Sequence, residues 1–290
     1  MCFLTILALN HSDGKRDNFL PEKFMDQFSI ALAQLEPVLF DKENNLAKAE
    51  EAIRQAADQG AAAILFPELF LTGYSLGERA VEMAETSEGA SIERVAELAG
   101  LYRIAILMGF AELSENGRQV YDAVAVANAQ GQLSGIYRKI HLFHDETGWF
   151  APGDQPLVID FGLGTTGLLI CYDLEFPEAA RQLALRGARW IATCTGNMVP
   201  NQHLQEIFLQ SRAAENHVWV AVANRVGREG DLDFFGGSGV ADPLGVLTAH
   251  AGPDETILFA DIDLGRAEPA RLNADYLADR RPEIYHPKTK

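Results

Sequence analysis

The stretch LLICYDLEFPE, residues 168–178, is an apolar run that ends on a cysteine and is followed at once by polar residues and a proline. The apolar run predicts a buried strand, and Pro177 is a favoured first residue of a helix. Cys171 is therefore expected at a strand-to-helix turn, where the helix dipole favours the thiolate and the side chain is exposed. A lone cysteine can also be an inert core residue, so this stretch alone leaves both interpretations open.

Two charged residues are candidates to act with a cysteine nucleophile. Glu68 follows the apolar run AAAILFP, whose proline, Pro67, is expected to end the strand. A carboxylate fixed at a strand end in this way is suited to act as a general base. Lys139 lies in GIYRKIHLF, predicted as the middle of an alternating strand, where it either faces solvent or supplies a fixed charge for an oxyanion. His141 and His144 lie three residues apart without the third ligand of a metal pattern, so we expect no metal.

Composition excludes several classes of function. The 290 residues are 48% apolar and 22% charged, as in a globular protein, and the net charge of −17 disfavours nucleic acid and membrane partners. Three scattered cysteines argue against a disulfide framework and favour a reducing, cytoplasmic setting. The phosphate-binding motif GxxxxGK[ST] is absent from the sequence, and no serine-hydrolase GxSxG motif stands at the end of a predicted strand.

Strand-like and helix-like segments alternate from residue 27 onward without a linker, which predicts a single domain over residues 27–290 with a charged C-terminal tail. Hairpins are expected over residues 120–142 and between residues 236–250 and 255–264, so a mixed α/β sandwich with outer helices is favoured. Residues 1–26 are expected to be an extension outside the fold. Their apolar start is too short to span a bilayer and lacks the basic region of a signal peptide.

Three ordered motifs together resemble those of the nitrilase superfamily of carbon–nitrogen hydrolases, over nearly the whole chain. ILFPELFLTGY resembles the glutamate motif and gives Glu68, YRKIHLF resembles the lysine motif and gives Lys139, and ICYDLEFPE resembles the cysteine motif and gives Cys171. HDETGWFAPGD is a looser match to a loop that carries a second glutamate, here Glu146.

The resemblance implies a four-layer α-β-β-α sandwich and a homodimer or larger homo-oligomer, with residues 203–216 and the tail after Leu264 as the expected interface. It implies hydrolysis of a small carboxamide to acid and ammonia through a cysteine thioester, without a metal or an organic cofactor. Glu68 would be the base, and Glu146 a second carboxylate that orients the substrate. Lys139 and the backbone N–H of Tyr172 would stabilise the oxyanion.

The residues after the nucleophile bear on the substrate. Cys171-Tyr172-Asp173 is more like the aliphatic amidase and carbamoylase branches than nitrilases, which resemble Cys-Trp-Glu at this point, so an amide is favoured over a nitrile. An N-carbamoyl amine or amino acid amidohydrolase is the alternative, followed by a nitrilase or a catalytically silent binding protein. Arg225 is a weak candidate for a carboxylate clamp, because a structural ion pair is the favoured interpretation of it. The lack of a clearly placed arginine favours a neutral amide over an N-carbamoyl amino acid.

Several further side chains are candidates to contact the substrate. Each of them could equally be an ordinary core or turn residue. The candidate pocket residues are Phe70, Tyr74, Trp149, Tyr172, Phe176 and Asn197.

Overall fold

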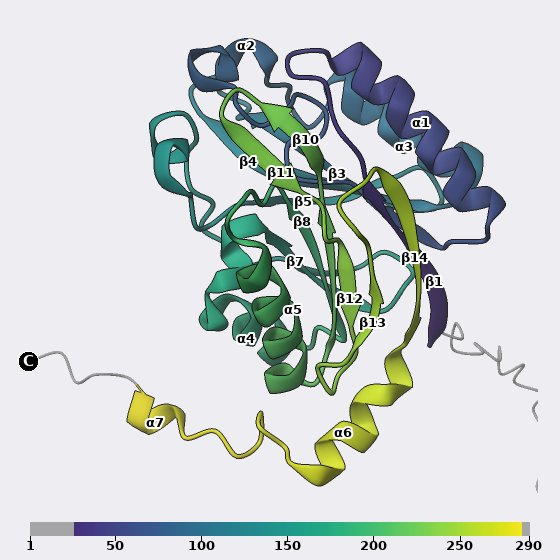
Figure 1. The fold of residues 1–290 in the computed structure, drawn as a ribbon, viewed down its shortest axis with the longest axis vertical. Helices are drawn as coiled ribbons and strands as arrows, with labels where there is room; N and C mark the ends of the chain where they lie inside the picture. Colours follow the sequence, from purple (N-terminus) through teal and green to yellow (C-terminus); the bar gives the residue numbers. More distant parts are fainter. Residues whose placement is uncertain (1–25, 286–290) are drawn as a thin grey trace, which may run out of the picture.

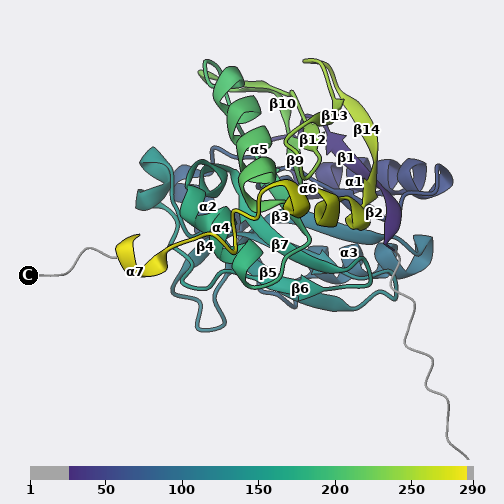
Figure 2. The ribbon, with the colours of Figure 1, turned by 90° about the horizontal axis from the view of Figure 1, so that it is seen from below.

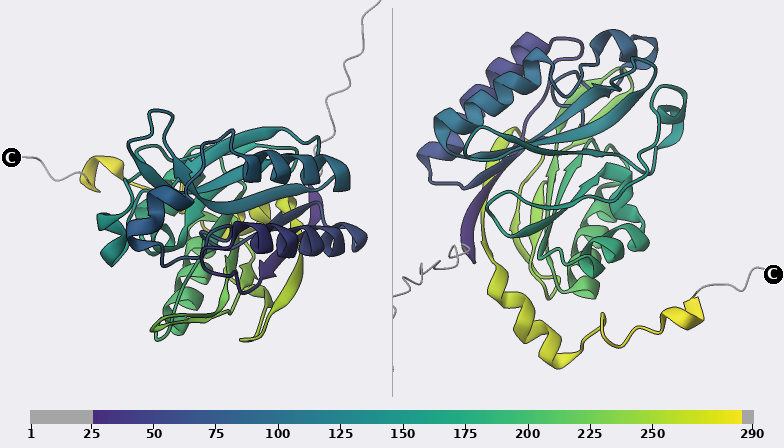
Figure 3. Two further views of the ribbon diagram at one scale, coloured as in Figure 1. Left: turned by 90° about the horizontal axis from the view of Figure 1, so that it is seen from above. Right: turned by 180° about the vertical axis from the view of Figure 1, so that it is seen from behind.

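Two six-stranded sheets face each other in the computed structural model, which describes residues 26–285, and helices cover the outer face of each sheet (Figures 1 and 3). The predicted four-layer α-β-β-α sandwich is confirmed. The expected N-terminal extension lies outside the described residues except for Asp26, which directly precedes the first strand. None of the described helices is long and apolar enough to cross a membrane.

The first sheet has the strand order β14-β1-β2-β3-β4-β5. Strands β1, β2 and β3 run parallel, and the other pairs are antiparallel. Its strands are β1 (Gln27–Gln34), β2 (Ala63–Leu65), β3 (Ala105–Leu113), β4 (Val120–Ala127), β5 (Leu133–Arg138) and β14 (Thr256–Asp263), and its outer helices are α1 (Lys42–Asp58) and α3 (Ala90–Tyr102).

The second sheet has the strand order β13-β12-β9-β8-β7-β6, with β7, β8 and β9 parallel. A separate two-stranded ribbon, β10 and β11, extends beyond it. The strands are β6 (Val158–Asp160), β7 (Thr165–Ile170), β8 (Trp190–Thr195), β9 (Trp219–Asn224), β10 (Val226–Glu229), β11 (Leu232–Phe235), β12 (Gly239–Ala241) and β13 (Leu247–His250), and the helices are α4 (Pro177–Leu185) and α5 (Gln202–Asn216).

Three short helices lie outside these layers. Helix α2 (Ala80–Met83) follows the loop after β2, and α6 (Ala267–Asn273) and α7 (Pro282–Tyr285) form the tail. Figure 2 shows this tail running along one end of the sandwich, away from the facing sheets.

Hydrophobic burial explains the layers. The inner faces of the two sheets pack on each other through residues such as Leu107, Ile170 and Trp190. Separate apolar clusters fill the spaces between each sheet and its helices. Because the central strands are covered on both faces, every residue of β2 and β8 is buried, including Thr193 and Thr195 of β8.

Two expectations about strands need correction. The predicted hairpin between residues 236–250 and 255–264 is wrong, since β13 pairs with β12 while β14 crosses to the other sheet and pairs with β1 along eight residues. This pairing ties the end of the chain to its first strand. Lys139 is not in mid-strand, because β5 ends at Arg138, and the lysine side chain is fully buried rather than facing solvent. The hairpin of β4 and β5 is confirmed.

The parallel strands position the candidate site. The carboxyl ends of neighbouring parallel strands meet at one edge of a sheet, and polar groups placed there converge. Glu68 follows the end of β2, Cys171 follows β7 and Asn197 follows β8. Since the two sheets face each other, these three residues meet between them.

Candidate active site

Cys171 is held in a constrained turn at the end of β7. Its φ of 44° is in the left-handed region, which is unfavourable for a residue with a side chain and needs support from its surroundings. That support comes from the buried Asp173 carboxylate, which accepts hydrogen bonds from the N–H of Ile170 at 3.1 Å and the hydroxyl of Tyr137 at 2.7 Å.

The expectation of an exposed thiolate at Cys171 is wrong. The side chain is only 6% exposed, and burial raises the pKa of the thiol well above its usual range, while the carboxylate of Glu68 raises it further and Lys139 opposes the shift. Helix α4 begins six residues later at Pro177, beyond the reach of its dipole. The thiol is therefore protonated at rest and needs a base to become a nucleophile.

Glu68 lies fully buried beside this thiol. Its Oε2 accepts a hydrogen bond from the N–H of Gly196 at 2.7 Å, and its Oε1 lies 2.5 Å from the Nζ of Lys139. Gly109 of β3 packs against the turn at residues 67–69 that carries Glu68. A Cβ at this glycine would lie 2.1 Å from the carbonyl oxygen of Pro67, so no larger residue fits without displacing the turn that carries Glu68.

Lys139 is the buried cation at the centre of the site. Its Nζ lies 2.5 Å from Glu68, 2.8 Å from Glu146 and 3.4 Å from Asp122. Burial lowers the pKa of Lys139, but the surrounding carboxylates outweigh burial and raise that pKa well above its usual range. The oxygens of the three carboxylates lie within 4.8 Å of one another, close enough for a metal ion, and the lysine ammonium supplies the positive charge there.

Glu146 is held by three donors. It accepts hydrogen bonds from the hydroxyl of Tyr74 at 2.6 Å, the N–H of Phe143 at 2.8 Å and the ammonium of Lys139. Burial raises the pKa of Glu146, and Lys139 opposes the shift. The loosely matched glutamate therefore belongs to the same buried cluster as Glu68 and Lys139.

Asp122 is a member of this cluster that the sequence analysis missed. Its carboxyl oxygens are buried in the middle of β4 and have no hydrogen-bond partner among the described residues, although Lys139 lies 3.4 Å away. Burial, followed by the neighbouring Glu68, raises the pKa of Asp122 well above its usual range. A neutral carboxylic acid fits this place best. The signal available in the sequence was one acidic residue in the otherwise apolar strand VYDAVAVA.

Asn197 borders the thiol, as its position after β8 suggested. Its Oδ1 lies 3.5 Å from the Sγ of Cys171, which makes it an acceptor for the thiol. The Nδ2 of Asn197 donates to Gln205, and its backbone N–H donates to the side chain of Asn224 at the end of β9. Gln205 and Asn224 were also missed, because their link to Asn197 exists only in the folded chain.

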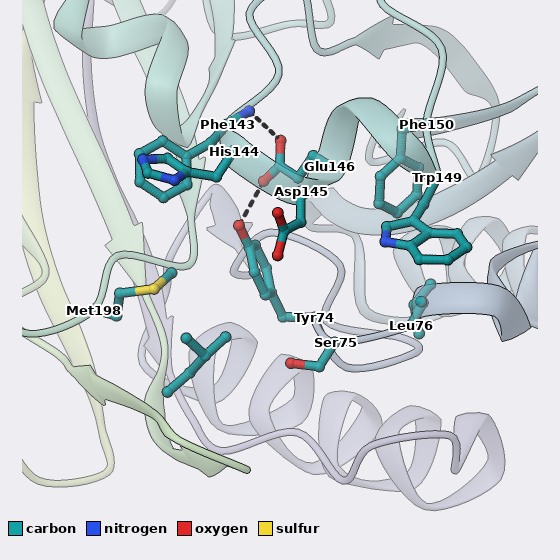
Figure 4. A pocket seen from close by; sticks show the side chains of 12 residues that line it. Tyr74, Ser75, Leu76, Phe143, His144, Asp145, Glu146, Trp149, Phe150 and Met198 are labelled. Atoms are coloured by element: carbon teal, nitrogen blue, oxygen red, sulfur yellow. Dashed lines mark hydrogen bonds between the residues drawn. The ribbon is translucent and has the colours of Figure 1, made fainter.

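A cavity of about 270 Å³ opens beside Glu146 (Figure 4). Of the predicted pocket residues, Tyr74 and Trp149 line it. Phe70 does not, since it packs on Phe66 in the core between the first sheet and its helices. Tyr172 instead packs edge-on against Phe143, which does line the cavity.

The remaining candidates have structural partners. Arg225 forms a buried ion pair with Glu229, so the interpretation as a structural ion pair is confirmed. His141 stacks on Phe176 and lies 2.7 Å from the Asp173 carboxylate, whereas His144 lies exposed against Phe143. The two histidines therefore do not share a site among the described residues.

Comparison with known proteins shows which family the chain belongs to. The family model described as carbon-nitrogen hydrolase matches residues 29–272. A Pseudomonas protegens protein described as "Hydrolase in pqqF 5'region" is 40% identical over 265 residues, covering 90% of this chain and 92% of that protein. A nitrilase of Pyrococcus abyssi is 37% identical over 263 residues, covering 88% of this chain and 98% of its own length.

The fold is also that of a solved amidase. The crystal structure of an amidase from Nesterenkonia sp. matches with a TM-score of 0.80 and 32% identity, covering 89% of this chain and 94% of that one. The family-model match over residues 29–272 includes Glu68, Lys139 and Cys171. The chain belongs to the carbon–nitrogen hydrolase family of the nitrilase superfamily, and it is an amidase-like hydrolase of carbon–nitrogen bonds.

Proposed function

We propose that the protein hydrolyses a small carboxamide to the acid and ammonia through a thioester on Cys171. The observation that carries this proposal is the buried group around Lys139, in which the ammonium lies 2.5 Å from Glu68 and 2.8 Å from Glu146 beside the buried thiol of Cys171. A variant of the Nesterenkonia amidase carries the acetamide moiety of fluoroacetamide covalently at its active-site cysteine, and this reactivity of the cysteine in that protein supports Cys171 as the nucleophile here.

Acylation would begin with proton transfer from the thiol of Cys171 to the carboxylate of Glu68. The sulfur attacks the amide carbon, and the C=O electron pair moves to the oxygen, where Lys139 and the backbone N–H of Tyr172 stabilise the negative charge. The intermediate collapses, the carbon–nitrogen bond breaks, and Glu68 returns its proton to the leaving nitrogen as ammonia departs.

Deacylation would use the same groups in reverse order. Glu68 takes a proton from water, the hydroxide attacks the thioester carbon, and the carbon–sulfur bond breaks to release the acid and restore the thiol. Glu146 remains bound to Lys139, Tyr74 and Phe143 and keeps the ammonium aimed at the reacting carbonyl. Because Glu68 carries the proton both ways, every step balances without a cofactor.

The sequence Cys171-Tyr172-Asp173 supports an amide rather than a nitrile as the substrate. An N-carbamoyl amine remains the second candidate, because its carbonyl would meet the same nucleophile. No arginine is among the described residues that line the cavity, and Arg225 is engaged by Glu229, which argues against an N-carbamoyl amino acid.

Ammonia release from matched amides, nitriles and N-carbamoyl compounds, with intact-mass detection of the enzyme, tests the proposal. We expect turnover of amides with an acyl adduct, and loss of both in Cys171→Ala. Cys194→Ala is the matched control, because Cys194 is a second buried free cysteine outside the catalytic group. Turnover of nitriles alone, or a Cys171→Ala enzyme that still releases ammonia, would contradict it.

We also propose a cytoplasmic homodimer or larger homo-oligomer. The segments predicted to form the interface carry exposed apolar side chains, namely Ile207 on α5, Leu272 on α6 and Ile284 and Tyr285 on α7. Leu272 is 85% exposed, which a subunit contact would relieve. Light scattering after gel filtration tests this, and a monomer across the micromolar range would contradict it.

A further inference from the structure

We propose, on the basis of the amidase function above, that the preferred amide carries a positive charge at the end remote from its carboxamide group. The cavity beside Glu146 is where the rest of the substrate would lie, because this residue belongs both to the cavity wall and to the group around Lys139. Among the described residues that line the cavity there is no lysine or arginine, while His144, Asp145 and Glu146 contribute titratable groups.

Among the described residues, the carboxylates that line or support the cavity wall have charged partners, except for Asp145. Glu146 is paired with Lys139, and Glu229, which binds the backbone N–H groups of Tyr74 and Ser75, is paired with Arg225. The Asp145 carboxylate makes no hydrogen bond or ion pair with the part of the chain that the structure describes. Figure 4 shows it within the ring of side chains that surrounds the cavity.

The rest of the wall is suited to a cation as well as to an alkyl chain. Tyr74, Phe143, Trp149 and Phe150 present aromatic rings to the cavity, and aromatic faces attract ammonium groups. A net charge of −17 also raises the local concentration of cationic substrates. An ammonium in this cavity would therefore meet both a free carboxylate and aromatic rings.

A substrate that ends in a carboxylate would be rejected by the same wall. It would lose hydration on entry, find no cationic side chain among the described lining residues, and be repelled by Asp145. Monoamides of dicarboxylic acids and N-carbamoyl amino acids are therefore expected to be poor substrates. This narrows the proposed substrate class to neutral and, preferentially, cationic amides.

Three amides with the same four-carbon spacer test the proposal, namely 5-aminopentanamide, hexanamide and adipic acid monoamide. They end in an ammonium, a methyl and a carboxylate. At pH 8, where ordinary imidazoles are neutral, we expect kcat/KM for 5-aminopentanamide to exceed that for hexanamide about tenfold, equivalent to ~1.4 kcal/mol, and adipic acid monoamide to be the poorest. The ratio of kcat/KM for 5-aminopentanamide to kcat/KM for hexanamide should fall as salt is added, because salt screens the attraction between the ammonium and Asp145.

Asp145→Asn should reduce the ratio of 5-aminopentanamide to hexanamide to about threefold or less, leaving only the aromatic contribution. Asp58→Asn is the matched control, because it removes the same charge from an exposed ion pair on α1 and should leave the ratio unchanged. Equal or greater activity on the anionic amide, an unchanged ratio in Asp145→Asn, or turnover of short amides but of none of these three would overturn the inference. Failure of the amidase function itself would appear as no turnover of any amide.

Discussion

Replacement of Lys139 by methionine tests whether the buried ammonium holds the catalytic carboxylates together. The side chain is fully buried and pairs with Glu68 and Glu146, and Asp122 lies 3.4 Å from its ammonium. Removing one partner of a buried ion pair leaves an uncompensated charge and costs about 3–5 kcal/mol. That is a large share of the roughly 5–15 kcal/mol that separates a folded domain from its unfolded chain. Lys139→Met should therefore unfold at a much lower urea concentration and be inactive.

Urea unfolding at pH 7, followed by tryptophan fluorescence, measures the change. Lys42→Met is the control, since Lys42 forms a partly exposed pair with Glu85 and its loss should cost about 1 kcal/mol or less. Adding Glu68→Gln to Lys139→Met removes one stranded carboxylate and should recover part of the lost stability without restoring activity. A Lys139→Met protein as stable as the wild type, or further loss in the double variant, would refute the reasoning.

Three further perturbations test other parts of the site. Glu68→Gln should stop acylation, so a rapid-quench experiment should detect no burst of ammonia, and a burst would show that another group is the base. Asp122 has a raised folded pKa, so its contribution to stability is full below its unfolded value near 3.8 and is lost as pH rises towards the folded value. Asp122→Asn should remove that loss, so the unfolding free energies of the two proteins should diverge as pH rises above about 3.8, by at most about 1.4 kcal/mol per pH unit, whereas parallel curves would mean that Asp122 is ionised. Gly109→Ala should lower both kcat and stability, the latter by about 1–3 kcal/mol, because its Cβ would meet the backbone beneath Glu68. Gly252→Ala, where a Cβ has open space, should change neither in the same assays.

The positions that the sequence predicted well are those that local patterns determine. Glu68 and Cys171 end apolar runs, so the strand boundaries alone place them at the edges of parallel strands. The layered fold followed from the alternation of strands and helices, because each apolar face needs a covering layer. Asn197 was found in the same way, from its position after β8.

The features that escaped prediction depend on contacts between distant segments. The pairing of β14 with β1 joins residues more than 200 positions apart, and a local hairpin pattern cannot reveal it. Asp122 becomes part of the site only because β4 lies beside β5 and brings it to Lys139. The protonation of Cys171 depends on burial and on Glu68, which the sequence alone does not measure. Phe70 failed as a pocket residue because its side chain turns towards the outer core.

The acyl adduct on Cys171 is the most direct test of the central claim. The enzyme is quenched in acid during turnover of a good amide substrate, digested, and analysed by peptide mass spectrometry. We expect the acyl mass on the peptide that contains Cys171, the same adduct in Cys194→Ala, and none in Cys171→Ala. An adduct on another residue, or undiminished ammonia release by Cys171→Ala, would contradict the covalent mechanism.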